Sequence, residues 1–202
     1  SVPIAQTVIA NTKNFEFARY VLDATASGED VRLTTVPLTY GPTLESSSAA
    51  TDLSNCRLFD GSVQLTSGSN IVNPSAAGSG TTFTFDGTGL IVSKGTSKTI
   101  ALQCDIVGGA AGAYYWGLDT GQASSYTGAT GLTSGQTITE VINESNGQRM
   151  AAATGGTYSV ALDSGSPGYK IVSAGTTGVE LARVRFSASN EEMGEWIILG
   201  IA

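Results

Sequence analysis

The two cysteines have the most distinctive chemistry in this chain. Cys56 and Cys104 each lie in a segment whose apolar residues alternate, which is typical of half-buried strands. Cys56 shares a face with Leu58, and Cys104 shares one with Leu102 and Ile106. Two inward-pointing cysteines on different strands can form a disulfide or remain separate buried thiols, and we expect the disulfide. Such a bond would imply an oxidising compartment.

Histidine is absent from the 202-residue sequence. Its absence excludes Ser-His-Asp and Cys-His catalysis, and it removes the side chain that most often binds transition metals. The glycine-rich run at 108–112 lacks the lysine of a phosphate-binding loop. We therefore expect no catalytic residue, no enzymatic activity and no cofactor.

Carboxylates are the remaining groups that could support hydrolysis, because a glycosidase needs two of them on either side of the scissile bond. The candidates are Glu16, Glu29, Asp30, Asp105, Asp119, Glu140, Glu180, Glu191 and Glu192. Most lie in turns or beside polar residues, which is typical of solvated surface carboxylates. The adjacent pairs at 29–30 and 191–192 could also bind calcium, although neither has the spacing of a dedicated calcium loop. The sequence leaves metal binding open.

The aromatic run Tyr114, Tyr115 and Trp116 has two interpretations. On a strand, Tyr114 and Trp116 would share a face with Leu118, which favours a position in the core. The alternative is an exposed platform on which a sugar ring stacks.

The composition predicts an all-β fold. Charged residues make up 13% of the chain and glycines number 26, so little charged helix surface can be built. Dipeptides such as Asp60-Gly61, Asp86-Gly87 and Asn146-Gly147 are typical of tight hairpin turns. The apolar phase slips between 31–33 and 36–38, which indicates a bulge or bend, and Pro37 favours an edge strand. We predict a β-sandwich or jelly roll over 12–202.

The net charge of −7 argues against binding to nucleic acid or to an anionic membrane surface. The longest apolar stretches, such as 196–199, are far shorter than the roughly 20 residues that a membrane-spanning helix needs. We expect no membrane insertion.

An internal repeat links the two ends of the sequence. Residues 3–24 align with 167–188 at a constant offset of 164. The identities are Pro3/Pro167, Val8/Val172, Ala10/Ala174, Thr12/Thr176, Glu16/Glu180, Ala18/Ala182, Arg19/Arg183 and Ala24/Ala188. The chain could hold one repeat unit plus the opening of the next, or a subunit could lend a terminal strand to its neighbour. Alternatively, two similar strands lie in one sandwich by chance or old duplication.

The first two interpretations predict head-to-tail association. An added strand satisfies the backbone groups of an exposed sheet edge and buries alternate side chains. We expect the N-terminal segment 1–11 to be the donor, because it is apolar and has an equivalent inside the chain. The residues expected in this assembly contact are Pro3, Ile4, Val8 and Ile9.

Short segments that combine strand and turn residues lie at 29–33, 53–61, 94–100 with 105–106, and 174–178. They resemble the β-sandwich repeat modules of large secreted bacterial cell-surface proteins, which form surface layers or fibres. The resemblance covers most of the chain and carries no catalytic signature. The cysteines at 56 and 104 depart from it, because plain apolar residues are expected there, and an added disulfide would explain them.

We therefore expect an extracellular structural subunit or module that assembles head to tail into a pilus-like filament or a surface layer. Its partners would be copies of itself or neighbouring modules. The alternative is an adhesin or a carbohydrate-binding module at the cell surface, with surface glycans as partners.

Overall fold

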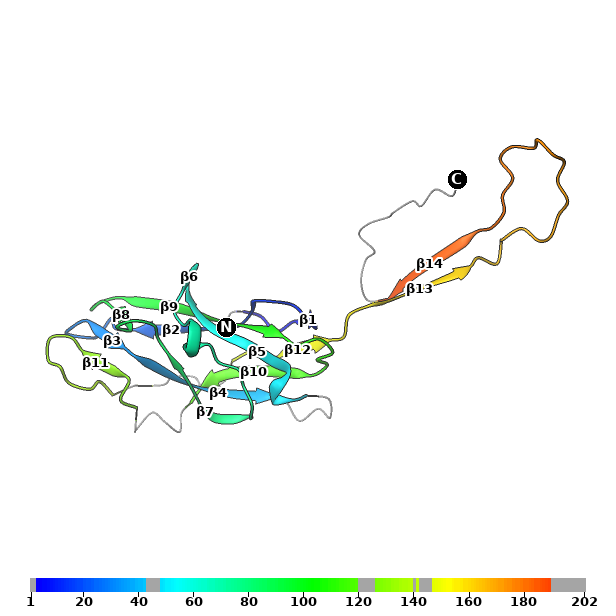
Figure 1. Ribbon diagram of the computed structural model, residues 1–202. Helices are drawn as coiled ribbons and strands as arrows, with labels where there is room; N and C mark the ends of the chain where they lie inside the picture. The colour runs from blue at the N-terminus through cyan, green and yellow to red at the C-terminus, as the bar shows by residue number, and fades with distance from the viewer. Residues whose placement is uncertain (1–2, 43–47, 120–125, 140, 142–146, 190–202) are drawn as a thin grey trace. The chain divides into compact units, whose positions relative to one another are not determined.

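Figure 1 shows the computed structural model, which describes residues 3–42, 48–119, 126–139, 141 and 147–189. The chain divides into two compact units, Ser1–Thr154 and Gly155–Ala202, called here the N-terminal unit and the C-terminal unit. Apart from two single-turn 3-10 helices, Ala50–Asp52 and Gly68–Asn70, the regular structure in the described ranges is β-strand. The predicted all-β class is confirmed.

The N-terminal unit contains three sheets. The five-stranded sheet has the order β1 (Thr7–Ile9), β12 (Met150–Ala153), β10 (Ala113–Leu118), β4 (Thr35–Pro42) and β7 (Gly78–Thr84). The four-stranded sheet has the order β2 (Phe15–Asp23), β9 (Ser97–Ile106), β5 (Leu53–Asp60) and β6 (Val63–Gln64). The three-stranded sheet has the order β11 (Ala129–Gly131), β3 (Val31–Leu33) and β8 (Leu90–Val92).

These sheets enclose one hydrophobic core, as expected for a β-sandwich. The five-stranded sheet contributes Tyr40 and Trp116, while the four-stranded sheet contributes Phe17, Leu58 and Ile100, all of them fully buried. Every residue of this core cluster lies in the N-terminal unit. The alternation of apolar side chains in the sequence supplies the inward rows, because successive residues of a strand point to opposite faces.

Local turn chemistry agrees with the sequence. Gly61 and Gly87 have φ values of 58° and 61°, which glycine adopts without steric cost. Gly61 lies in the turn of the β5–β6 hairpin, as predicted. Gly87 follows β7, but β7 and β8 belong to different sheets, so the hairpin predicted at Asp86-Gly87 is wrong. The predicted turn at Asn146 lies outside the described residues. The slip in apolar phase is also confirmed, because the chain leaves β3 and enters β4 of a different sheet after Thr34.

The C-terminal unit contains a single described hairpin. Its strands are β13 (Thr157–Leu162) and β14 (Val184–Ser189), which pair antiparallel. Figure 1 shows the long connection that joins them. We expected one domain over 12–202 with a separate segment at 1–11; in the structure, β1 of that segment pairs in parallel with β12, and the division falls after Thr154.

Within the described ranges, no helix has both the length and the apolar character needed to cross a membrane.

Candidate assembly interface

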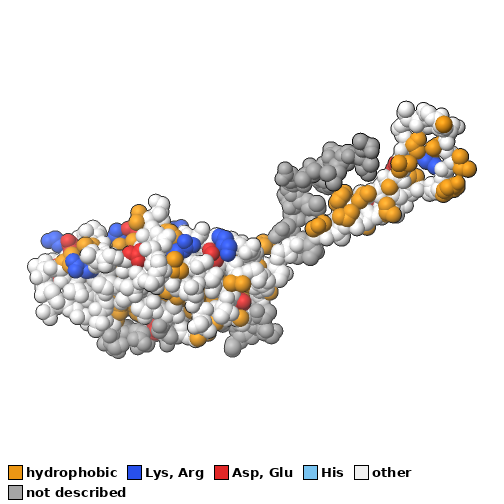
Figure 2. Space-filling model, viewed as in Figure 1, with side chains coloured by type: hydrophobic (Ala, Val, Ile, Leu, Met, Phe, Trp, Pro, Cys, Tyr) orange, Lys and Arg blue, Asp and Glu red, His pale blue; other side chains and the backbone are white. Residues whose placement is uncertain are grey.

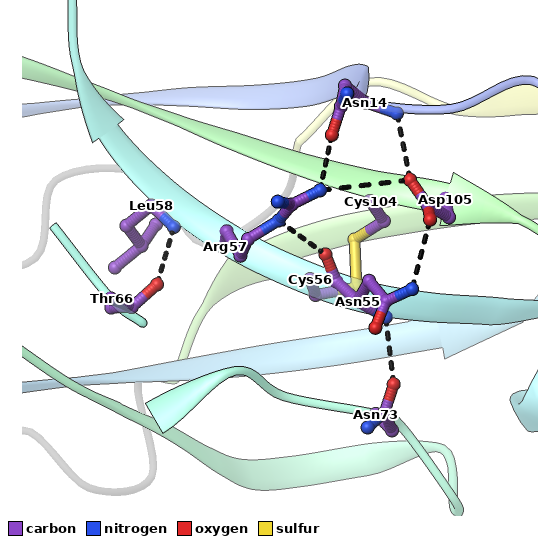
Figure 3. Close-up of a disulfide and its surroundings, with 9 residues drawn as sticks. All are labelled: Asn14, Asn55, Cys56, Arg57, Leu58, Thr66, Asn73, Cys104 and Asp105. Atoms are coloured by element: carbon purple, nitrogen blue, oxygen red, sulfur yellow. Dashed lines mark hydrogen bonds and ion pairs between the residues drawn. A yellow bond between two sulfur atoms is a disulfide. The ribbon is translucent and has the colours of Figure 1, made fainter. Parts of the chain in front are cut away.

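The two cysteines form a disulfide that joins β5 to β9 in the N-terminal unit (Figure 3). Both residues are fully buried in the hydrophobic core. The ladder between β5 and β9 is irregular here, and the Cys56 backbone bonds instead to Val72, with N···O distances of 2.8 and 3.0 Å. The disulfide therefore holds the two strands together where their own hydrogen bonding is interrupted.

Asp105 organises the polar side of this cross-link. Its carboxylate accepts hydrogen bonds from the Asn14 backbone N–H at 2.9 Å and from the Asn55 side-chain amide at 3.0 Å. The Lys13 ammonium lies 3.5 Å away. Asn14 and Asn55 both have positive φ values, 53° and 50°, which asparagine tolerates better than most residues. Figure 3 shows Arg57 reaching the same group.

These contacts give the Asp105 carboxyl a structural role. Burial raises its pKa, but the hydrogen bonds from Asn55 and Asn14 and the charge of Lys13 outweigh burial, so the pKa lies below its ordinary value. Because the pKa of Asp105 is lower in the folded than in the unfolded state, its ionised carboxylate stabilises the fold above about pH 4. This stabilisation is lost as the pH falls through the folded-state pKa.

Asp105→Asn is expected to lower the free energy of unfolding by about 1–3 kcal/mol at pH 7, because the charge of a buried carboxylate that accepts several hydrogen bonds is lost. Near pH 3 the difference should shrink, because the unchanged Asp105 begins to take up a proton. Urea unfolding at both pH values measures this. An equal difference at the two pH values would show that the charge is not what matters.

Three other acidic candidates, Glu16, Glu180 and Glu29, also have local structural partners. Glu16 pairs with Arg19 at 2.7 Å, and Glu180 pairs with Arg183. Glu29 accepts hydrogen bonds from the Thr133 and Ser134 backbone N–H groups at 2.7 and 2.8 Å. The Ser134 hydroxyl and these N–H groups lower the pKa of Glu29.

Metal binding was left open for the two acidic turns. The Asp30 carboxylate accepts a hydrogen bond from the Lys94 backbone N–H at 2.9 Å, so it joins two loops. Glu140, Glu191 and Glu192 lie outside the described residues. In the part of the chain that the structure describes, no three His, Cys, Asp or Glu side chains come close enough together to hold a metal ion.

The aromatic run belongs to the core, as one of its two interpretations predicted. Trp116 is fully buried, stacks on Tyr40 at a centroid distance of 4.6 Å and meets Phe83 edge-on at 5.7 Å. Tyr114 is also buried, and its hydroxyl donates to Asp52 at 2.5 Å. A sugar ring cannot stack on side chains that are covered by protein, so the platform interpretation of Trp116 is wrong.

The repeat in the sequence is also a repeat in the structure. Asn11 and Gly175 occupy equivalent positions and have φ values of 73° and 86°. The hydroxyl of Thr12 donates to the Ile9 carbonyl at 2.7 Å. In the second copy, the hydroxyl of Thr176 donates to the Ser173 carbonyl at 2.8 Å. The same turn therefore forms at both ends of the chain.

The segments that follow these turns also match. Asn14 and its equivalent Gly178 both have positive φ, at 53° and 70°. Two residues further along, each copy has a glutamate that pairs with the arginine three residues later. These pairs are Glu16 with Arg19 and Glu180 with Arg183. The local sequence is sufficient for these features, because they form in the C-terminal unit without the sheets that surround the first copy.

The two copies differ in what covers them. Phe17 in the first copy is fully buried, whereas its equivalent Leu181 is 84% exposed. Val184 and Phe186, which correspond to Tyr20 and the half-buried Leu22, are exposed as well. Figure 2 shows hydrophobic side chains along the hairpin and its connecting loop. In the described part of this unit, the exposed large hydrophobic residues are Tyr158, Val160, Leu162, Tyr169, Ile171, Val172, Leu181, Val184 and Phe186.

The N-terminal residues expected in the assembly contact lie in or beside β1. Val8 and Ile9 belong to this strand and are half-buried, Pro3 is half-buried, and Ile4 is 72% exposed. Donation of this segment to another subunit stays a prediction.

The exposed strand β13 was not predicted from the sequence as an assembly surface. Its alternation of Tyr158, Val160 and Leu162 with smaller residues was visible as a strand pattern. That pattern marks a strand with one apolar face, but it does not show whether other strands cover this face.

The fold and these surfaces define an all-β, disulfide-linked sandwich that carries a second copy of its own opening segment, in which large apolar side chains are exposed. Comparison with family models, with curated proteins and with solved structures found no match.

Proposed function

We propose that this chain is an extracellular structural subunit or module that assembles head to tail into a cell-surface filament or surface layer. The disulfide is compatible with an oxidising, extracellular compartment. The low share of charged residues and the resemblance to secreted surface modules support the same setting.

The observation that carries the proposal is the uncovered C-terminal copy. An isolated two-stranded hairpin is marginally stable in water, and large exposed apolar patches mark interaction sites. The first copy shows how such a segment is buried when further strands surround it, with Phe17 and Ala18 inside the core. A neighbouring unit that covers Leu181 and Val184 would bury apolar side chains that are exposed in the C-terminal copy.

The test compares the full chain with a chain that ends at Thr154. We expect the full chain to form elongated particles as its concentration rises, followed by analytical ultracentrifugation and electron microscopy. The shortened chain should remain a folded monomer with a β-rich circular dichroism spectrum, because it keeps every residue of the core.

A chain that lacks Ser1–Ala10 is the matched comparison for the N-terminal route. Loss of assembly in this variant alone, while it stays folded, would identify 1–11 as the donor. A full chain that stays monomeric at all concentrations would contradict the proposal that its copies assemble.

A further inference from the structure

We propose that β13 of one copy adds to the free edge of β2 in a second copy and so forms the head-to-tail contact. This inference rests on the proposed assembly and names the two strands that meet in it. It follows from a difference between the two copies of the repeat, whose equivalent strands are paired along opposite edges.

In the first copy, β2 uses one edge to pair with β9. The Ala24 N–H donates to the Thr96 carbonyl at 2.9 Å, and the Gly95 N–H donates to the Ala24 carbonyl at 2.9 Å. Because backbone groups along an antiparallel strand alternate between its two edges, even-numbered residues from 18 to 24 face β9. The N–H and C=O groups of Arg19, Val21 and Asp23 therefore face the opposite edge, which no described strand covers.

In the second copy, β14 uses the other edge to pair with β13. The Asp163 N–H donates to the Arg183 carbonyl at 2.9 Å, in register with the β13–β14 ladder. Residues 183, 185 and 187 therefore face β13. They correspond, at the offset of 164, to residues 19, 21 and 23. β13 thus occupies in the second copy the edge that is free in the first.

The side chains of β13 suit the free edge of β2. Tyr158 and Leu162 are both 73% exposed in the hairpin, and Val160 is also exposed. In the β13–β14 ladder, these three residues lie opposite Ala188, Phe186 and Val184. At the offset of 164, those β14 residues correspond to Ala24, Leu22 and Tyr20, the inward row of β2. The apolar row of β13 would then extend the core side of the four-stranded sheet. In the same register, Asp163 would lie opposite the guanidinium-bearing Arg19.

Replacement of β14 by the β2 of a second copy is favourable for a physical reason. β14 belongs to a hairpin whose side chains are largely exposed, whereas β2 is already fixed in a packed sheet. A strand that adds to a preorganised edge gains backbone hydrogen bonds without ordering a second flexible strand. Val21, in the middle of that edge, is 65% exposed.

The test uses a fluorescent peptide with the sequence of residues 155–164 and the full chain at a concentration below its assembly. Val21→Pro removes an outward N–H and leaves the ladder to β9 intact, because proline is tolerated on the free side of an edge strand. We expect this change to weaken peptide binding by at least roughly tenfold. The matched control Val21→Thr keeps the N–H and should bind within about twofold of the unchanged chain.

A peptide carrying Val160→Asp provides a second test that does not depend on folding of the chain variant. It should lose measurable binding, because the charge would face the apolar row of β2.

Equal binding of the peptide to the unchanged and Val21→Pro chains, or of both peptides to the unchanged chain, would overturn the inference. If full chains assemble and Val21→Pro assembles equally well, β13 docking is wrong and the proposed assembly stands. If the peptide binds as expected while the full chain stays monomeric, the docking stands and the proposed assembly falls.

Discussion

Replacing Cys56 and Cys104 with alanine is expected to lower the free energy of unfolding by about 4 kcal/mol. The disulfide links residues 48 positions apart, so its removal releases a long loop in the unfolded chain. In the chain-entropy model, the cost of this release grows with the logarithm of loop length. The two strands also lose their connection at an interrupted part of the ladder between β5 and β9.

Urea unfolding of the full chain, followed by circular dichroism, measures this effect. The unchanged chain in the presence of a reductant is the control, because it removes the cross-link and retains both sulfur atoms. Similar losses in the control and in the double alanine variant would assign the effect to the cross-link. Two alkylatable thiols in the unfolded, unreduced protein would contradict the disulfide itself.

Trp116→Ala should destabilise the sandwich by about 3–5 kcal/mol, because it leaves a large cavity in the core. The indole stacks on Tyr40 and meets Phe83, so both rings lose contacts. The same urea experiment measures the change in the midpoint and in the extrapolated free energy.

Trp116→Phe is the matched control. The indole Nε1 is buried and has no hydrogen-bond partner among the described residues, so phenylalanine removes an unsatisfied donor while it keeps most of the ring packing. We expect this variant to lose less than half as much stability as Trp116→Ala. Equal losses would show that the stability depends on the indole itself and not on filling the core.

Patterns within single segments were sufficient to predict much of this protein. Alternation placed Cys56, Cys104 and Trp116 on inward faces, because side-chain direction along a strand has a period of two residues. The repeat between 3–24 and 167–188 also accounts for the turn that the structure shows in both copies, since its hydrogen bonds join residues three apart. Each of these features depends on neighbours in the sequence.

Contacts between distant segments decided other features. Pro37 suggested an edge strand, yet β4 lies inside its sheet, between β10 and β7. The ladder to β10 begins at Leu38, so the missing N–H of Pro37 falls just beyond this pairing. The polar cluster around Asp105 likewise brings together Asn14, which precedes β2, and Asn55 of β5, which no local pattern indicates.

The sequence by itself determined which side chains of the repeated strands face inward, and the tertiary structure decided which strands cover them. Tyr20 and Val184 have the same place in the repeat, but in the part of the chain that the structure describes only Tyr20 has sheets around it. Side-chain alternation also says nothing about which edge of a strand is paired, because the backbone N–H and C=O groups lie in the plane of the sheet. Those groups find partners only when distant strands meet, and this leaves Val21 on a free edge and Arg185 on an occupied one.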